Sequence, residues 1–152
     1  MPDGPVPEPQ EVISAVAQAA SRLESAGIAP ETLGTYQPEA RRFGIGRRER
    51  ITPAGEAWRL GALLLLPSGR AAGIGEVIVA QEERRRGFTA ESARRRAELG
   101  EAAVRGGIAP GRTVHLGWRV IDPAHAVVTW SAGAPPIPIL DYLRERLETV
   151  LG

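Results

Sequence analysis

Histidine is the residue type with the most direct catalytic potential in this chain, because imidazole is the usual general base near neutral pH. The chain has two histidines: His115 lies within an alternating apolar segment, and His125 lies in the turn that follows. Two imidazoles do not make a histidine-based metal site unless carboxylates complete it. One functional hypothesis is therefore an enzyme that uses the polar face of a sheet around His115, with Arg119 and either Arg59 or Glu76.

The usual nucleophiles lack their motifs. The chain contains no cysteine and no lysine, which excludes thiol nucleophiles, cysteine-based zinc sites, Schiff-base lysines and Ser-x-x-Lys dyads. No serine lies in a Gly-x-Ser-x-Gly elbow. Gly44-Ile45-Gly46 begins like a dinucleotide fingerprint, but it lacks the third glycine and precedes a strand instead of opening a helix. We therefore predict no catalytic residue, no metal and no cofactor, and we favour a protein that is not an enzyme.

Arginine supplies the second candidate chemistry. All 19 basic residues are arginines, and guanidinium groups suit phosphate recognition. Glutamates dilute the clusters near 84–86 and 94–96, and we interpret the segment 41–50 as the undiluted one. An alternative function is therefore polyanion binding, to nucleic acid or phosphate, through Arg41, Arg42, Arg47, Arg48 and Arg50. The net charge of +1 adds no general attraction to nucleic acid. The candidate ligand-binding residues of the whole chain are Arg47, Arg48, Arg50, Arg59, His115 and Arg119.

The apolar stretch 57–80 is the segment around which we expect the fold to form. Two apolar runs flank Pro67-Ser68-Gly69-Arg70, which is typical of a β-hairpin with strands near 57–66 and 72–80. Both faces of the first strand are mostly apolar, so we expect it to be covered on both sides. Alternation places one apolar set on a single face: Trp58, Leu60, Ala62 and Leu64.

A second hairpin is predicted further along the chain. Alternation of apolar and polar residues over 113–121 predicts a strand with one solvated face, and 122–125 forms the turn to a returning strand at 126–131. The expected register pairs Val120 with Ala126, Trp118 with Val128, and Leu116 with Trp130. Both Trp118 and Trp130 are then expected in the core, and His115 is expected opposite Ser131 on the polar side.

Apolar residues at helical spacing predict three helices, near 9–26, near 89–105 and from about 137–140 to the C-terminal end. The sequence Gly-Ile-Ala-Pro follows each of the first two helices. Either a duplicated helix–hairpin unit or the common residues of helix ends explains this echo. Residues 28–56 are expected to form a long irregular loop, with a short helical turn beginning at Pro30.

These elements predict a single α+β domain at residues 10–152 after a flexible N-terminal tail at residues 1–9. The expected fold is a four-stranded antiparallel sheet of two β-hairpins with three helices mainly on one face, in the order α-ββ-α-ββ-α. Because three helices cover only part of such a sheet, Leu63 and Leu65 need cover on the second face, either from the segment 28–56 or, where that segment does not seal the face, from a second copy. The leading hypothesis is therefore a non-enzymatic binding or structural module that self-associates as a homo-oligomer, most simply a homodimer.

The chain gives no signal for a membrane. Its longest uninterrupted apolar run, 62–66, is too short to cross a bilayer. The first residues lack both the basic start and the apolar stretch of a signal peptide. We expect a cytoplasmic protein without a membrane partner.

One set of motifs resembles a known group of proteins. The run from Arg50-Ile51-Thr52-Pro53 to Trp58-Arg59-Leu60-Gly61, together with residues 103–107, is similar to a group of short uncharacterised bacterial proteins. The resemblance covers roughly residues 15–120. Some members carry a glutaminase label, but a serine glutaminase of the β-lactamase-like kind needs a Ser-x-x-Lys pair and this chain has no lysine. The resemblance therefore implies no active-site residues.

Overall fold

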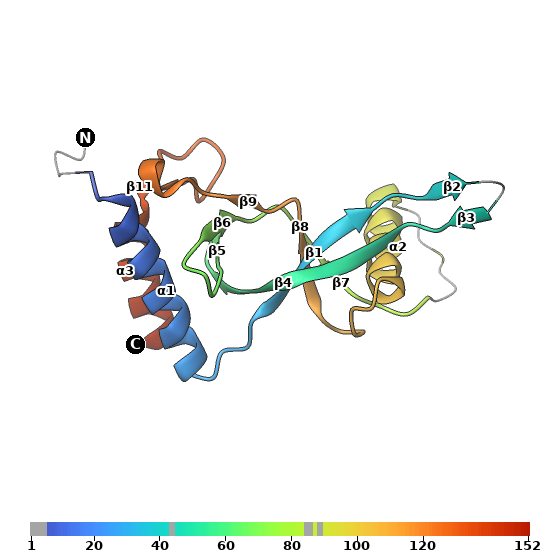
Figure 1. Cartoon of the computed structure of the whole chain (residues 1–152), viewed down its shortest axis with the longest axis horizontal. Helices are drawn as coiled ribbons and strands as arrows, with labels where there is room; N and C mark the ends of the chain where they lie inside the picture. Colours follow the sequence, from blue (N-terminus) through green and yellow to red (C-terminus); the bar gives the residue numbers. More distant parts are fainter. Residues whose placement is uncertain (1–5, 43–44, 84–86, 88–89) are drawn as a thin grey trace. The chain divides into compact units, whose positions relative to one another are not determined.

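A computed structural model of the chain describes residues 6–42, 45–83, 87 and 90–152, with only the backbone given at 41, 42 and 45. Within these residues it holds three α-helices and eleven β-strands, which confirms the α+β class (Figure 1). The helices are α1 (Pro9–Ser25), α2 (Glu91–Arg105) and α3 (Ile139–Leu151). The strands are β1 (Glu31–Gln37), β2 (Ala40–Arg42), β3 (Ile45–Arg47), β4 (Arg50–Leu60), β5 (Leu63–Leu65), β6 (Ala71–Gly73), β7 (Glu76–Val79), β8 (Thr113–Leu116), β9 (Arg119–Val120), β10 (Val127–Val128) and β11 (Ile137–Pro138).

The main sheet has seven strands and is mixed, so the prediction of a four-stranded antiparallel sheet is wrong. Its strand order is β7-β8-β1-β4-β5-β6-β9, and separate two-stranded ladders join β10 to β11 and β2 to β3. β1 and β8 run parallel, with Thr32 opposite Val114. Parallel pairing joins segments that are distant in sequence, which is why a reading based on local hairpins misses it.

The first predicted hairpin contains an extra reversal of the chain. Leu60 and Leu63 are opposite each other in an antiparallel ladder, so the apolar run forms two strands, β4 and β5, joined by a two-residue turn. Gly61 makes this turn possible because its φ of 62° lies in the left-handed region that favours glycine. The turn at 67–70 then joins β5 to β6 as predicted.

The extra turn changes which leucines share a face. Trp58 and Leu60 pack in one core with Leu63 and Leu65, whereas the alternation predicts Leu64 as their partner. All of Leu63, Leu64 and Leu65 are 0% exposed in a single copy of the chain. Cover on both faces is therefore correct, but no second copy is needed to provide it.

The second predicted hairpin does not form. Gly117, at φ 65°, separates β8 from β9, and the two strands then have different neighbours. β8 lies between β7 and β1, β9 pairs with β6, and β10 pairs with β11. Trp118 is half-buried, but Trp130 is 49% exposed, so its predicted core position is wrong.

The segment 28–56 is built largely of strands, contrary to the expected irregular loop and helical turn. β1 begins at Glu31, directly after Pro30, and β2, β3 and the first part of β4 follow. Gly34 explains how β1 fits. A Cβ at Gly34 would lie 2.6 Å from Ile51 Cγ2 and 2.8 Å from a methyl carbon of Val114, so only glycine allows this close packing.

The three helices lie where their periodicity predicts. α1 buries Val12, Val16, Ala19, Ala20 and Leu23, which is the predicted apolar stripe. Thr89, at which the second predicted helix begins, lies outside the described residues. α1 and α2 end with the same hydrogen bonds, from Ile28 N–H to the Leu23 carbonyl and from Ile108 N–H to the Ala103 carbonyl. The repeated Gly-Ile-Ala-Pro sequence thus serves one helix-ending geometry at two places.

The chain forms two compact units. Unit 1 comprises residues 1–30, 57–74 and 119–152, and unit 2 comprises residues 31–56 and 75–118. The core of unit 1 joins α1 and α3, which lie side by side, to the strands β4, β5 and β6 (Figure 1). The core of unit 2 packs α2 against β4, β7 and β8, and its members include Ile51, Ile78, Leu99, Val114 and Leu116. Among the described residues, no helix combines the length and the apolar character needed to cross a membrane.

Candidate functional sites

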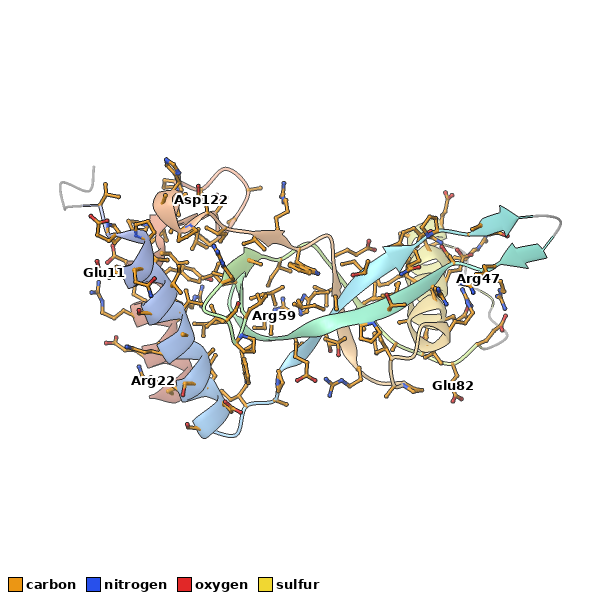
Figure 2. All side chains as sticks on the ribbon, viewed as in Figure 1. Glu11, Arg22, Arg47, Arg59, Glu82 and Asp122 are labelled. Atoms are coloured by element: carbon orange, nitrogen blue, oxygen red, sulfur yellow. The ribbon has the colours of Figure 1, made fainter. Side chains whose placement is uncertain are left out.

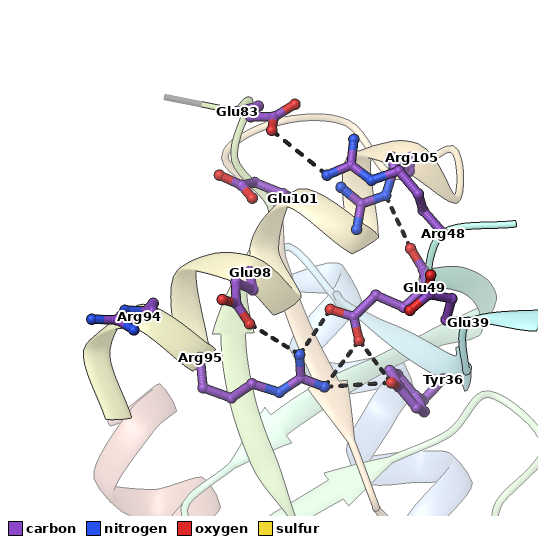
Figure 3. A pocket seen from close by; sticks show the side chains of 10 residues that line it. All are labelled: Tyr36, Glu39, Arg48, Glu49, Glu83, Arg94, Arg95, Glu98, Glu101 and Arg105. Carbon is purple, nitrogen blue, oxygen red and sulfur yellow. Dashed lines mark hydrogen bonds and ion pairs between the residues drawn. The ribbon is translucent and has the colours of Figure 1, made fainter. Parts of the chain in front are cut away.

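Unit 2 contains a groove of about 750 Å³ that we call the charged groove (Figure 3). Half of its lining residues come from α2, and the others come from β1, from positions 39, 48 and 49, and from position 83. Of its ten lining residues, five are glutamates and four are arginines. They are Tyr36, Glu39, Arg48, Glu49, Glu83, Arg94, Arg95, Glu98, Glu101 and Arg105.

A network around Glu49 organises the charged groove. Arg95 donates from Nη1 to Glu49 Oε1 at 2.8 Å and from Nη2 to Glu49 Oε2 at 3.0 Å, which is the two-pronged geometry that favours arginine over lysine. The Tyr36 hydroxyl donates to the same carboxylate at 2.7 Å. Arg95 also donates to Glu98 at 3.2 Å, while Arg94 points away from this network (Figure 3).

The network changes the titration of its members. The hydrogen bonds from Arg95 lower the pKa of Glu49 below its ordinary value of 4.5, those from Tyr36 act in the same direction, and partial burial opposes them. The carboxylate of Glu49 in turn raises the pKa of Arg95. Both groups are therefore charged throughout the neutral range, and the groove holds its ion pair without a protonation step.

Two other arginines of the charged groove, Arg48 and Arg105, also have an acidic or a carbonyl partner. Arg48 lies 3.6 Å from Glu83, and both side chains are more than 60% exposed. Arg105 donates from Nε to the Glu49 carbonyl at 3.0 Å. Because glutamates outnumber arginines along the groove, its local charge does not favour a polyanion.

The structure does not bring the six predicted ligand-binding residues together. Arg47, Arg48, Arg50 and His115 belong to unit 2, whereas Arg59 and Arg119 belong to unit 1. Figure 2 shows Arg47 on β3 and Arg59 on β4. Of the six, only Arg48 lines the charged groove. The side chains of Arg41 and Arg42, and all of 84–86, lie outside the description.

His115 lies in a different environment from the one expected of it. Its side chain is 0% exposed, and its Nε2 lies 2.7 Å from Oε1 of Glu31 on β1. Its Nδ1 is buried and has no hydrogen-bond partner among the described residues. Glu76, the predicted carboxylate partner, is exposed and lies opposite Leu116 instead. The predicted solvated face around His115 is therefore wrong, and this imidazole has no contact with solvent.

Metal ligands are not gathered in the part of the chain that the structure describes. Within it, no group of three or more histidine, cysteine, aspartate or glutamate side chains is placed to hold a metal ion. His125 pairs only with Asp122, at 3.3 Å, on an exposed turn. The backbone N–H of Ala124, followed by His125, lowers the pKa of Asp122. This arrangement is a capped turn and carries no further chemistry.

Unit 1 has an apolar site that sequence reasoning missed. Val120, Val127 and Trp130 are 52%, 49% and 49% exposed, and all three line a groove of about 500 Å³. We call this the Trp130 surface. Both residues of β9, the last strand in the order of the main sheet, line the groove, and one of them is Arg119. Large apolar side chains gathered in this way mark binding surfaces more often than isolated ones do.

Trp130 also lines a second hollow of about 280 Å³. α3 supplies Tyr142, Glu145, Arg146 and Thr149 to this hollow, and Ile137 completes it with Trp130. Two signals in the sequence could have indicated that Trp130 lies outside the core. The strand predicted to hold it is followed by Gly133, Pro135 and Pro136, and Gly117 interrupts its predicted partner.

Comparisons with protein-family models, with curated proteins and with solved structures found no match to this chain.

Proposed function

We propose that this protein is a non-enzymatic binding module that associates with a second copy of itself through the Trp130 surface. The observation that carries the proposal is the half-exposed set of Val120, Val127 and Trp130 around one groove. Removing apolar area from water is favourable by about 25 cal/mol per Å². A partner that covers these three side chains gains that free energy, which a lone copy forgoes.

Trp130 has the properties of a central contact residue. Tryptophan is enriched among the few side chains that dominate interface energies, because it buries a large rigid area at little entropic cost. Trp130 is 49% exposed and lines two hollows. The half-exposed indole therefore offers apolar area to a partner, and the hollows that it lines could receive side chains of that partner.

The neighbouring strand adds a second reason for association. β9 ends the strand order of the main sheet and has β6 as its neighbour there. An edge strand beside an apolar groove is a known route to pairing with another chain unless charge or cover protects it. Arg119 gives this edge a single charge, and Val120 follows it directly in the groove.

The proposal keeps the predicted self-association but changes its physical basis. The sequence argument required cover for Leu63 and Leu65, and both are already 0% exposed in one copy. Among the large apolar side chains that stay exposed, three gather around one groove, and these are the side chains of the Trp130 surface. The polyanion alternative is weakened by the glutamates of the charged groove, and the enzyme alternative by the burial of His115.

A matched pair of valines tests the proposal. Val120 on β9 and Val79 on β7 are 52% and 53% exposed, and each lies on a strand at one end of the sheet order. Val120→Asp should weaken self-association by at least about tenfold, because it places a charge in the apolar groove. Val79→Asp should leave it unchanged. Sedimentation equilibrium of both variants measures this, and equal behaviour of the two variants would refute the proposed surface.

A further inference from the structure

We infer that two copies exchange their N-terminal segments, so that residues 5–9 of each copy lie in the groove of the Trp130 surface of the partner subunit. This inference rests on the proposed self-association and names the part of the second copy that fills the groove. The segment reads Pro5-Val6-Pro7-Glu8-Pro9, and we call it the proline segment. The structure describes it from Val6 onward, and α1 begins at its last residue. A reciprocal exchange uses the same two surfaces twice, so it closes as a pair of identical chains.

Alternating prolines favour an extended conformation of the proline segment. Proline fixes its own φ at about −65° and keeps the residue before it out of the helical region. Val6 and Glu8 each precede a proline. Glu8 accordingly has φ −65° and ψ 146°, which is the geometry of a polyproline II helix. A segment that is already extended loses little conformational entropy on binding, and extended proline-rich segments dock in grooves that contain aromatic side chains.

Val6 gives the proline segment an apolar side chain that its own copy leaves in water. It is 78% exposed, which is the highest value among the large apolar side chains that the structure describes. Trp130 is 49% exposed in the same copy. The segment of one chain therefore does not cover the groove of that chain. Binding of Val6 in the groove of a partner removes apolar area of both surfaces from water, which is favourable.

The charges of the segment and of the groove are complementary. Of the thirteen described residues that line the groove, Arg119 is the only charged one, and it is exposed. Glu8 is also exposed, and no arginine precedes Arg22 in the sequence. Within the described ranges, neither Arg119 nor Glu8 has an ion-pair partner. An acidic segment therefore meets a groove with one positive charge, and such complementarity favours this partner over a basic one.

The proline segment and the groove belong to the same compact unit. Unit 1 includes residues 1–30 and 119–152. Within it, α1 contacts the short helix η1 (Pro123–His125), which lies between β9 and β10 in the chain. Residues of both strands line the groove. The exchange therefore involves unit 1 of each copy and does not depend on how the two units of a chain are placed.

A substitution in the proline segment tests the exchange. Val6→Asp should weaken self-association by about tenfold, as expected for Val120→Asp, because it puts a charge where an apolar side chain enters the groove. In its own copy Val6 does not line the groove. Val150→Asp is the matched control, because Val150 is 49% exposed on α3 and lines neither hollow. It should leave self-association unchanged. Sedimentation equilibrium gives the dissociation constants.

A mixture of two weak variants tests whether the segment binds the other copy. A Val6→Asp chain keeps an intact groove, and a Val120→Asp chain keeps an intact segment. A mixed pair therefore has one complete contact, whereas a pair of like variants has none. The mixed pair should bind about threefold more tightly than either variant binds itself, because one of two equal contacts returns. Sedimentation equilibrium of the equimolar mixture measures this difference.

The outcomes separate the exchange from the proposed self-association. Weakening by Val6→Asp, an unchanged control and a tighter mixed pair support the exchange. A Val6→Asp chain that associates like the natural chain, or a mixed pair no tighter than the variants alone, would overturn the exchange. Weakening by Val120→Asp would then still support self-association through the Trp130 surface. Equal weakening by Val150→Asp would also overturn the exchange, and a natural chain that stays monomeric would overturn both proposals.

Discussion

At the scale of single residues, Glu49 is the common partner of two arginines. Its carboxylate accepts hydrogen bonds from Arg95 and Tyr36, and its backbone carbonyl accepts one from Arg105. One glutamate thus engages two guanidinium groups of α2. An arginine-rich sequence suggests a surface that binds anions. Here the guanidinium groups of Arg95 and Arg105 instead link α2 to Glu49 within the same unit.

Glu49→Gln should make the free energy of unfolding less dependent on pH in the acidic range. The folded state lowers the pKa of Glu49, so this group contributes stability above its unfolded pKa of about 4.5 and loses it as pH falls through the folded value. At pH 7 the substitution should cost about 1 kcal/mol of unfolding free energy, since Arg95 is 46% exposed and solvent screens the pair.

Urea unfolding at a series of pH values measures this effect. The difference between the natural chain and Glu49→Gln should shrink as pH falls below about 4.5. Glu82→Gln, at an exposed glutamate, serves as the control and should show no such convergence. A constant difference from pH 7 to pH 2.5 would contradict the role assigned to Glu49.

The partners of individual side chains were the least predictable part of the sites. Arg48 lies beside Glu83, and His115 beside Glu31, in pairs that are far apart in sequence. Their residue types are visible in the sequence, but the pairing depends on which strands become neighbours. The prediction that the segment 41–50 is undiluted therefore fails, because Glu49 lies within the segment and Glu83 lies beside Arg48 in space.

At the scale of elements, α2 packs closely on its strands through small residues. The alanines of this helix predict a close approach to the sheet, and the glycines allow it. A Cβ at Gly106 would collide with the backbone carbonyl of Ile51, and a Cβ at Gly100 with that of Val79. A backbone carbonyl cannot rotate aside as a flexible side chain can, so the helix itself would have to move.

Gly106→Ala should therefore destabilise the protein by about 2 kcal/mol or more, as overpacking against backbone does. Gly87→Ala is the matched control, because a Cβ there meets nothing within 4 Å. Its effect should stay within about 0.5 kcal/mol. Chemical unfolding followed by circular dichroism compares the two variants. Equal midpoints would contradict the close packing of α2 against β4.

Helices were more predictable than strands for a physical reason. The bounds of α1 follow from a stripe of residues that bury one face, and its end follows from Gly27. Strand pairing depends on where the chain turns. The turn at Gly61 lies within an apolar run, where no polar residue marks a turn in the sequence. That single two-residue turn moves Leu64 to the opposite face and replaces one predicted hairpin by three antiparallel strands.

At the scale of the whole molecule, two apolar cores account for most of the buried side chains. The core of unit 1 includes α1 and α3, the core of unit 2 includes α2, and each unit has its own surface feature. Unit 2 carries a groove in which Glu49, Arg95 and Glu98 form a charged network, and unit 1 carries exposed apolar side chains around a groove. A predicted function in self-association is therefore assigned to the Trp130 surface of unit 1.

The mass of the protein in solution as a function of concentration tests this account most directly. Sedimentation equilibrium should show the mass rising from 16.2 kDa toward twice that value as concentration increases. Trp130→Ser should remain at the mass of one chain over the same range, because it removes the side chain shared by both hollows. A natural chain that stays at 16.2 kDa up to about millimolar concentration, or a Trp130→Ser variant that associates as strongly as the natural chain, would contradict the account.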